Sequence, residues 1–285
     1  MSEYTGARGT AWFRALTGNV PPITGDPRSV LTADASIGDT PARFLCVVPD
    51  PLARFPCARH GEVGLEEAYT LATRVREVID EDRNAVKRPV IAIVDVKSQA
   101  YGRREETAAI FLAAAAAADA YGSARLAGHP VIALVVGHAF SGGFLTHGYQ
   151  ANRILAFDDD GVMIHAMHKE AAARITRRSV ENLEKLGKTI PPLSYDVRDF
   201  AKLGLLHKLL HVEDPDHPSE TETRKVRDEL SAAVEDARRN PWDLRNRLES
   251  KEARDTRRAT IRTRALLETQ WREEAGQTGS DPPHG

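Results

Sequence analysis

The sequence of 285 residues contains only two cysteines, Cys46 and Cys57, and their spacing matches neither a CxxC motif nor a zinc site. A disulfide scaffold and a cysteine-based metal site therefore have no support, and a reducing compartment, the cytoplasm, is expected. No apolar run approaches the length that crosses a bilayer, and the first residues lack the apolar core of a signal peptide. We therefore expect a soluble chain with no membrane partner.

Neither sign of charge predominates in the chain. Its 39 basic residues stand against 41 acidic residues, which gives a formal net charge of −2. Such a balance provides no general attraction toward nucleic acid or anionic membranes, so a nucleic-acid partner is disfavoured. The length suits one large domain or a domain with an appendage.

The order of the predicted elements is typical of an α/β protein with a largely parallel sheet, because strands alternate with helices. Strands are expected at Ser29–Ala35, Arg43–Val48, Val90–Val94, Val131–Val136, Arg153–Phe157 and Val162–Met167, and helices at Leu65–Asp82, Arg104–Leu126 and Lys169–Leu186. Four parts are predicted: an N-terminal arm (1–27), a core (28–215), a C-terminal helical extension (216–273) and a disordered tail (274–285).

One junction carries most of the functional information. The apolar run Val131–Val136 predicts a buried strand that Gly137 ends, and a glycine pair follows where a short helix begins. If Ser141 caps that helix, the amides of Gly142 and Gly143 become unscreened donors able to stabilise an oxyanion or enolate. The alternative is that the two glycines only let the helix pack close to the strand.

Two segments show a family resemblance. IVDVKSQAYGRREE (93–106) and VVGHAFSGGFLTHG (135–148) resemble the acyl-CoA carboxyltransferase branch of the crotonase superfamily, and more closely the γ subunits of biotin-independent malonate decarboxylases. The likeness extends in order over roughly residues 12–210. Lys97 is a departure, since the resemblance leads us to expect proline after Asp95 and Val96.

The resemblance implies a fold and an activity. The fold is crotonase-like (Clp protease/crotonase), a spiral of ββα units, here followed by the C-terminal helical extension. A homologous β subunit and an acyl carrier protein subunit are the implied partners in a hetero-oligomer. The malonyl group is carried on a CoA-like phosphopantetheine arm of the carrier, and the complex releases CO2 to leave an acetyl thioester. No cofactor and no biotin are expected on this chain.

The predicted site residues follow from the junction and from the resemblance. The catalytic set consists of Gly142 and Gly143 as oxyanion donors, Ser141 as their cap and polar neighbour, and Ala100, Tyr101 and Gly102 as a second donor loop. The predicted substrate-binding residues are Ser98, Gln99, His138 and His147. The two histidines have an equally open structural interpretation. No metal is expected, because the nearest pair, His165 and His168, lies at a strand end rather than on a helix face.

Three other functions remain open at this stage. The same amides fit an α-type subunit of a biotin-dependent acyl-CoA carboxyltransferase, where they would face the biotin urea oxygen. A noncatalytic scaffold subunit is the second alternative. The third is a serine hydrolase, because Ala139–Gly143 is one residue from the G-x-S-x-G nucleophile elbow, although no triad histidine or acid can be singled out.

Overall fold

A mostly parallel sheet forms the centre of the structure, a computed structural model that describes residues 5–239 and 244–278. Six of its seven strands follow the order β1-β2-β4-β6-β7-β9, and β8 pairs with β6. The strands are β1 (Val30–Ile37), β2 (Thr40–Val47), β4 (Val90–Val96), β6 (Val131–Phe140), β7 (Arg153–Phe157), β8 (Met163–His165) and β9 (Lys208–Leu210). Only the β1–β2 pair is antiparallel among these pairings. A small parallel sheet joins β3 (Glu62–Val63) to β5 (Ser98–Gln99).

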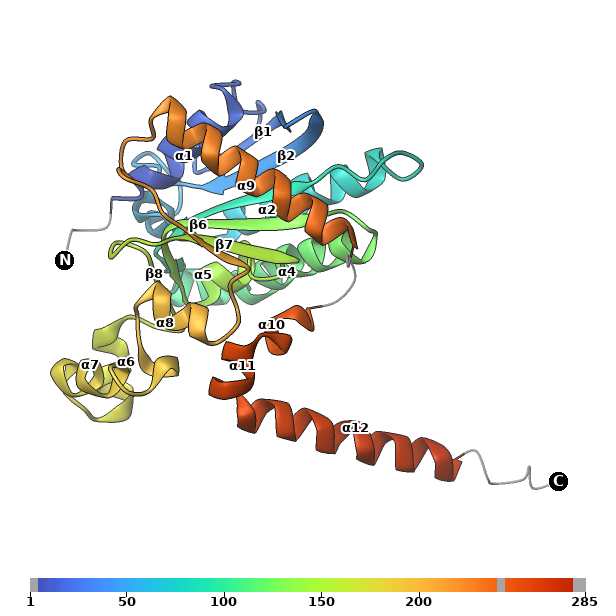
Figure 1. The fold of residues 1–285 in the computed structure, drawn as a ribbon. Helices are drawn as coiled ribbons and strands as arrows, with labels where there is room; N and C mark the ends of the chain where they lie inside the picture. The colour runs from blue at the N-terminus through green and yellow to red at the C-terminus, as the bar shows by residue number, and fades with distance from the viewer. Residues whose placement is uncertain (1–4, 240–243, 279–285) are drawn as a thin grey trace.

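Helices cover the central sheet on both faces. All seven residues of β4 are buried, which is typical of a strand covered on both sides. Helices α1 (Ala7–Thr17) and α9 (Glu220–Arg239) pack against each other and the sheet, while α2 (Leu65–Glu81) and α4 (Ile110–Leu126) pack together behind it (Figure 1). The predicted α/β class is confirmed, and the successions β2-β3-α2 and β4-β5-α4 are the expected ββα units.

Strand β6 is longer than the sequence predicts. Gly137 does not end it, because the strand continues through Phe140. A side chain at Gly137 would have its Cβ 2.3 Å from Asp95 Oδ1, so this glycine makes room for a buried carboxylate. Asp95 in turn accepts backbone N–H groups from Gly9 at 3.2 Å and from His138 at 3.1 Å. The glycine therefore serves a contact between α1, β4 and β6, not a strand end.

The prediction of a single helix over Arg104–Leu126 also needs correction. The Ala-rich segment is not one helix, because α3 (Arg103–Thr107) ends before α4 begins, and Ala109 between them has a left-handed φ of 61°. Helix α12 (Arg258–Thr278) runs through residues 274–278, the first part of the predicted disordered tail. The rest of that tail, 279–285, lies outside the described residues.

The N-terminal helix belongs to the hydrophobic core. Trp12, Phe13 and Leu16 of α1 are at most 1% exposed. The Trp12 ring packs edge-on against Phe157 with centroids 4.7 Å apart, and its Nε1 donates to the carbonyl oxygen of Pro215 at 2.8 Å. One side chain therefore ties together the N-terminal helix, strand β7 and the segment that leads into α9.

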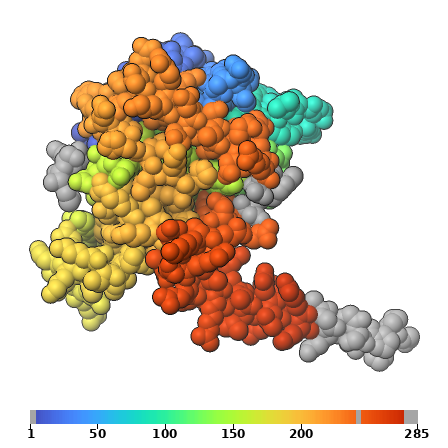
Figure 2. Space-filling model, viewed as in Figure 1, coloured from blue at the N-terminus to red at the C-terminus, as the bar shows by residue number. Residues whose placement is uncertain are grey.

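The segments after β8 form two peripheral parts. Helices α6 (Lys169–Thr176) and α7 (Val180–Gly187) make a small lobe that α8 (Val197–Lys202) joins to the sheet. Helices α10 (Asn246–Glu249) and α11 (Lys251–Thr256) lie near α8, and α12 projects away from the body (Figures 1 and 2). Among the described helices, none combines the length and the apolar character that crossing a membrane requires.

Replacing Trp12 by alanine should lower the free energy of unfolding by about 3–5 kcal/mol, because it removes a fully buried aromatic ring and its hydrogen bond. Trp271→Ala is the matched control, since Trp271 of α12 is 72% exposed and its loss should change stability by less than about 0.5 kcal/mol. Urea denaturation of the two variants measures both values. Equal, small effects would contradict the placement of α1 in the core.

Candidate functional site

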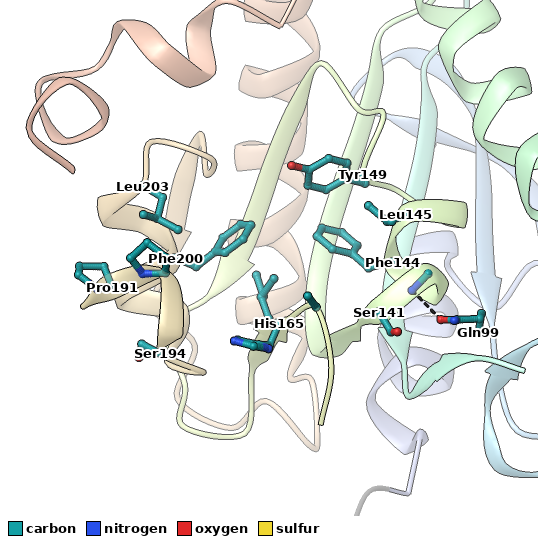
Figure 3. A pocket seen from close by; sticks show the side chains of 14 residues that line it. Gln99, Ser141, Phe144, Leu145, Tyr149, His165, Pro191, Ser194, Phe200 and Leu203 are labelled. Atoms are coloured by element: carbon teal, nitrogen blue, oxygen red, sulfur yellow. Dashed lines mark hydrogen bonds between the residues drawn. The ribbon is translucent and has the colours of Figure 1, made fainter. Parts of the chain in front are cut away.

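The parallel pairing of β4 and β6 brings two chain junctions to one edge of the sheet. Val96 at the end of β4 lies beside Ala139, just before β6 ends. The chain then enters β5 from β4, and helix α5 (Ser141–Thr146) from β6. The carboxyl ends of parallel strands are the usual place for a ligand site in such sheets. Gln99 and Ser141 therefore meet at this edge, as Figure 3 shows.

A cavity of about 550 Å³ opens at these junctions. This volume lies within the range of small-molecule sites, and its walls are mainly apolar. The walls come from α5 and the residues after it, from β8, and from the segment around α8. The lining residues are Gln99, Ser141, Gly142, Phe144, Leu145, Tyr149, Ile164, His165, Ala166, Pro191, Pro192, Ser194, Phe200 and Leu203.

The backbone amide of Gly142 has a side-chain partner in this cavity. Its N–H donates to Gln99 Oε1 at 2.6 Å (Figure 3). Ser141 precedes it with a left-handed φ of 59°, a conformation that costs a non-glycine residue about 1–2 kcal/mol. The predicted cap is wrong, because Ser141 is the first residue of the helix and the N-cap position belongs to Phe140, without a side-chain hydrogen bond. The strain at Ser141 instead turns the chain sharply from strand to helix.

Gly143 is required by a close approach of two backbones. A Cβ on this residue would lie 2.5 Å from both the carbonyl carbon and the carbonyl oxygen of Ser98 and 3.0 Å from the amide nitrogen of Gln99. Backbone atoms cannot move aside as the end of a side chain can. The glycine therefore lets α5 pack directly on β5, as the alternative interpretation of the glycine pair proposed, and this contact also fixes the main chain at Gln99.

None of the three residues of the predicted second donor loop, Ala100, Tyr101 and Gly102, lines the cavity. The Ala100 amide donates to the carbonyl oxygen of Val63 at 2.8 Å, so its predicted role as a donor to substrate is wrong. Ser98 is 1% exposed, and its hydroxyl donates to the carbonyl oxygen of Gln99 at 2.6 Å. Tyr101 and Gly102 are not among the residues that line the cavity. Only Gln99 of this segment reaches it.

The predicted substrate contact of His147 is wrong. Its ring is fully buried, Nδ1 lies 2.9 Å from the Tyr121 hydroxyl oxygen, and Nε2 lies 2.9 Å from the carbonyl oxygen of Ile93. Burial lowers the pKa of His147 to about 4, so the imidazole is neutral at physiological pH. Its interactions anchor the end of α5 to β4 and α4. The structural interpretation left open by the sequence therefore holds.

His138, the other predicted substrate-binding histidine, does not line the cavity. Its ring packs edge-on against Phe140 with centroids 5.1 Å apart. Burial, together with the nearby His168 and two basic side chains, lowers the pKa of His138 to about 4.

Sequence reasoning missed the other half of the cavity. His165 lines it from β8, stacked on Tyr195 at 3.9 Å with an angle of 12° between the rings. Its Nδ1 lies 3.0 Å from the carbonyl oxygen of Met167, and burial lowers its pKa. The position at the end of a strand paired with β6 was the available signal, but the sequence does not show that β8 pairs there.

Within residues 5–239 and 244–278, no cluster of three or more His, Cys, Asp or Glu is arranged to hold a metal.

The C-terminal extension supports one cavity wall. Arg247 of α10 is 6% exposed, and its Nη2 donates to the carbonyl oxygens of Tyr149 at 2.7 Å and Ala151 at 2.6 Å. Its guanidinium also lies over the Tyr149 ring, and this ring packs edge-on against Phe144 at 5.3 Å. Burial lowers the pKa of Arg247 to about 10, which leaves it charged at neutral pH. The extension therefore holds Tyr149 directly, and through it supports Phe144, which also lines the cavity.

The mostly parallel sheet, its ββα units and the cavity at its strand ends define a crotonase-like fold. Transcarboxylase 12S shares this fold, with a TM-score of 0.53 and 19% identity over 73% of this chain and 36% of that chain. The model of the malonate decarboxylase gamma subunit matches residues 58–271. The chain belongs to the malonate decarboxylase gamma subunit family.

Two relatives agree with this membership. A chain of a Pseudomonas malonate decarboxylase hetero-tetramer, solved in complex with coenzyme A, is 53% identical and has a TM-score of 0.88, with coverage of 93% of this chain and 99% of that chain. The malonyl-S-ACP:biotin-protein carboxyltransferase MADD of Malonomonas rubra is 36% identical over 217 residues, which is 73% of each chain.

The buried neutral His147 should make stability depend on pH. The unfolded chain binds a proton at this histidine near its ordinary pKa of about 6.5, whereas the folded chain binds it only near pH 4. The stability that the folded state gains from the neutral His147 is therefore fully present above about pH 6.5. As the pH falls toward 4, the free energy of unfolding decreases by about 1.4 kcal/mol per pH unit on account of this group. The free energy of unfolding, measured by urea denaturation at several pH values between 6.5 and 4.5, should fall with decreasing pH in the unmodified chain. In His147→Gln, the slope of this free energy against pH should be smaller by about that amount. An unchanged slope would contradict the burial of a neutral ring.

Proposed function

We propose that this chain stabilises, through the Gly142 amide, the enolate oxygen that forms when a malonyl thioester loses CO2. The observation that supports this role is the Gly142 N–H, which donates at 2.6 Å to a carbonyl-type oxygen within the cavity. A thioester carbonyl oxygen is a planar sp² acceptor, as the amide oxygen of Gln99 is, although a weaker one. Gly143 is the second proposed donor, and Ser141 is the polar neighbour that turns the chain.

The chemistry requires little beyond orientation and electrostatics. Decarboxylation becomes possible when the breaking C–C bond stands perpendicular to the carbonyl plane, so that its electrons pass into the enolate oxygen. A preorganised donor at that oxygen typically lowers the barrier by about 2.7–4 kcal/mol. The apolar walls at Phe144, Leu145 and Ile164 add to this, because a carboxylate loses hydration there whereas the CO2 product is neutral.

The proposed complex contains at least two further subunits. The solved relatives are described as an MdcD–MdcE hetero-dimer and as a hetero-tetramer, the latter with coenzyme A or with malonate. By this likeness, a homologous β subunit completes the site here, and an acyl carrier protein delivers the malonyl group on a CoA-like arm. Both cysteines of the described chain are free, which supports a cytoplasmic location.

A second activity has one specific observation in its favour. The Malonomonas relative is named as a carboxyltransferase to a biotin protein, and the chain is 36% identical to it. In that reaction the carboxyl group moves to biotin instead of leaving as CO2. The higher identity of 53% to a malonate decarboxylase chain favours direct release.

Release of CO2 from a malonyl thioester should proceed without biotin. The chain, co-expressed with its β and carrier subunits, is supplied with carrier protein bearing [14C]malonyl, and the released 14CO2 is counted. Addition of avidin should leave the rate unchanged, because avidin removes only biotin-dependent turnover. A rate that depends strictly on an added biotin protein would establish the carboxyltransferase instead.

Replacing Gly143 by alanine should lower kcat by about 10²–10³-fold, because the new Cβ collides with the Ser98 backbone and displaces the adjoining amides. Gly122→Ala is the matched control, since a Cβ on this α4 residue meets no atom within 4 Å. The assay is 14CO2 release by complexes shown by gel filtration to contain every subunit. Normal turnover by an intact Gly143→Ala complex would support a scaffold role for this chain.

A further inference from the structure

We infer that the Gln99 side chain is a built-in substitute for substrate, which occupies the Gly142 amide until the thioester oxygen displaces it. This inference rests on the proposed function and adds a residue that sets substrate affinity. The Gln99 amide oxygen is the acceptor at 2.6 Å, and Gln99, Ser141 and Gly142 together line the cavity. An acceptor already stands where the substrate acceptor must bind.

The main chain at Gln99 is held on two sides, so the position of its side chain is not accidental. On one side, β5 pairs with β3 in the register Val63↔Gln99. On the other, α5 packs so closely that a Cβ on Gly143 would lie 3.0 Å from the Gln99 amide nitrogen. The side chain then extends from this fixed backbone to Gly142, where a Cβ would meet its Oε1 at 2.8 Å. The backbone contacts fix the main chain on both sides, so displacement of Gln99 Oε1 from Gly142 requires rotation of the side-chain torsions.

Replacing Gln99 Oε1 by a substrate oxygen at the Gly142 amide changes the free energy little when that oxygen belongs to the bound thioester. The same replacement is favourable when the oxygen belongs to the enolate. A thioester oxygen that replaces Gln99 Oε1 forms one neutral hydrogen bond at the expense of another, so ground-state binding gains little. The enolate oxygen carries negative charge, and hydrogen bonds to charged acceptors are about twice as strong. Gln99 therefore weakens substrate binding without weakening the transition state relative to bound substrate, and this raises KM while leaving kcat unchanged.

The test replaces Gln99 by leucine, whose side chain is one atom shorter, branched and without an acceptor. In the complete complex, Gln99→Leu should lower KM for malonyl-carrier protein by roughly 2- to 12-fold, the equivalent of one neutral hydrogen bond, with kcat unchanged. Gln99→Glu should raise KM, because a carboxylate is the stronger acceptor. Gln150→Leu is the matched control, since Gln150 does not line the cavity.

A pair of inhibitors shows whether the effect acts at the carbonyl oxygen. Carrier protein with an acetylated prosthetic thiol keeps the thioester oxygen, whereas carrier with an ethylated thiol lacks it. Gln99→Leu should lower Ki for the acetyl form by the same factor as KM and leave Ki for the ethyl form unchanged. A higher KM in Gln99→Leu would show that the Gln99 side chain binds substrate directly. Equal changes in both Ki values would show that Gln99 has a structural role. Either result overturns the inference. Absence of CO2 release by the unmodified complex would instead reject the proposed function.

Discussion

The direct packing of the Gly143 backbone on the Ser98–Gln99 backbone is the contact on which the site depends. Because no side chain separates α5 from β5, the junctions that follow β4 and β6 approach to the distance of main-chain contact. Only at that distance can the side chain of one junction reach the amide of the other. The hydrogen bond between Gln99 and Gly142, and the cavity edge beside it, are consequences of this contact.

Buried polar groups hold the junctions in place from behind. His147 bonds to Tyr121 and to the Ile93 carbonyl, and Asp95 accepts amides from α1 and from β6. Burial raises the pKa of Asp95 and lowers the pKa of His147, which is the expected response of both groups to loss of water. Donors fixed in this way need no reorganisation when charge develops on a substrate, and such preorganisation is the main source of electrostatic catalysis.

Elements with a local sequence pattern were predicted correctly. The predictions failed where contacts between distant parts of the chain determine where a strand ends or which partner a group has. The α/β core, the glycine pair and Gln99 all followed from apolar runs or from family resemblance. The end of β6 was misplaced because the role of Gly137 depends on Asp95, which is 42 positions away in the chain. Likewise, the Ala100 amide is paired with Val63, and His165 reaches the cavity only because β8 pairs with β6. No spacing rule encodes these partners.

The cavity is assembled from segments that span most of the chain. Its floor comes from the junctions after β4 and β6, one wall from the α8 region, and another from Tyr149, which Arg247 of the C-terminal extension holds. A buried guanidinium whose bonds go to backbone carbonyls specifies one position for the loop it binds, because a charge that lost these acceptors would remain desolvated. The extension is thus part of the site architecture. The match to the gamma subunit family, which continues to residue 271, includes Arg247.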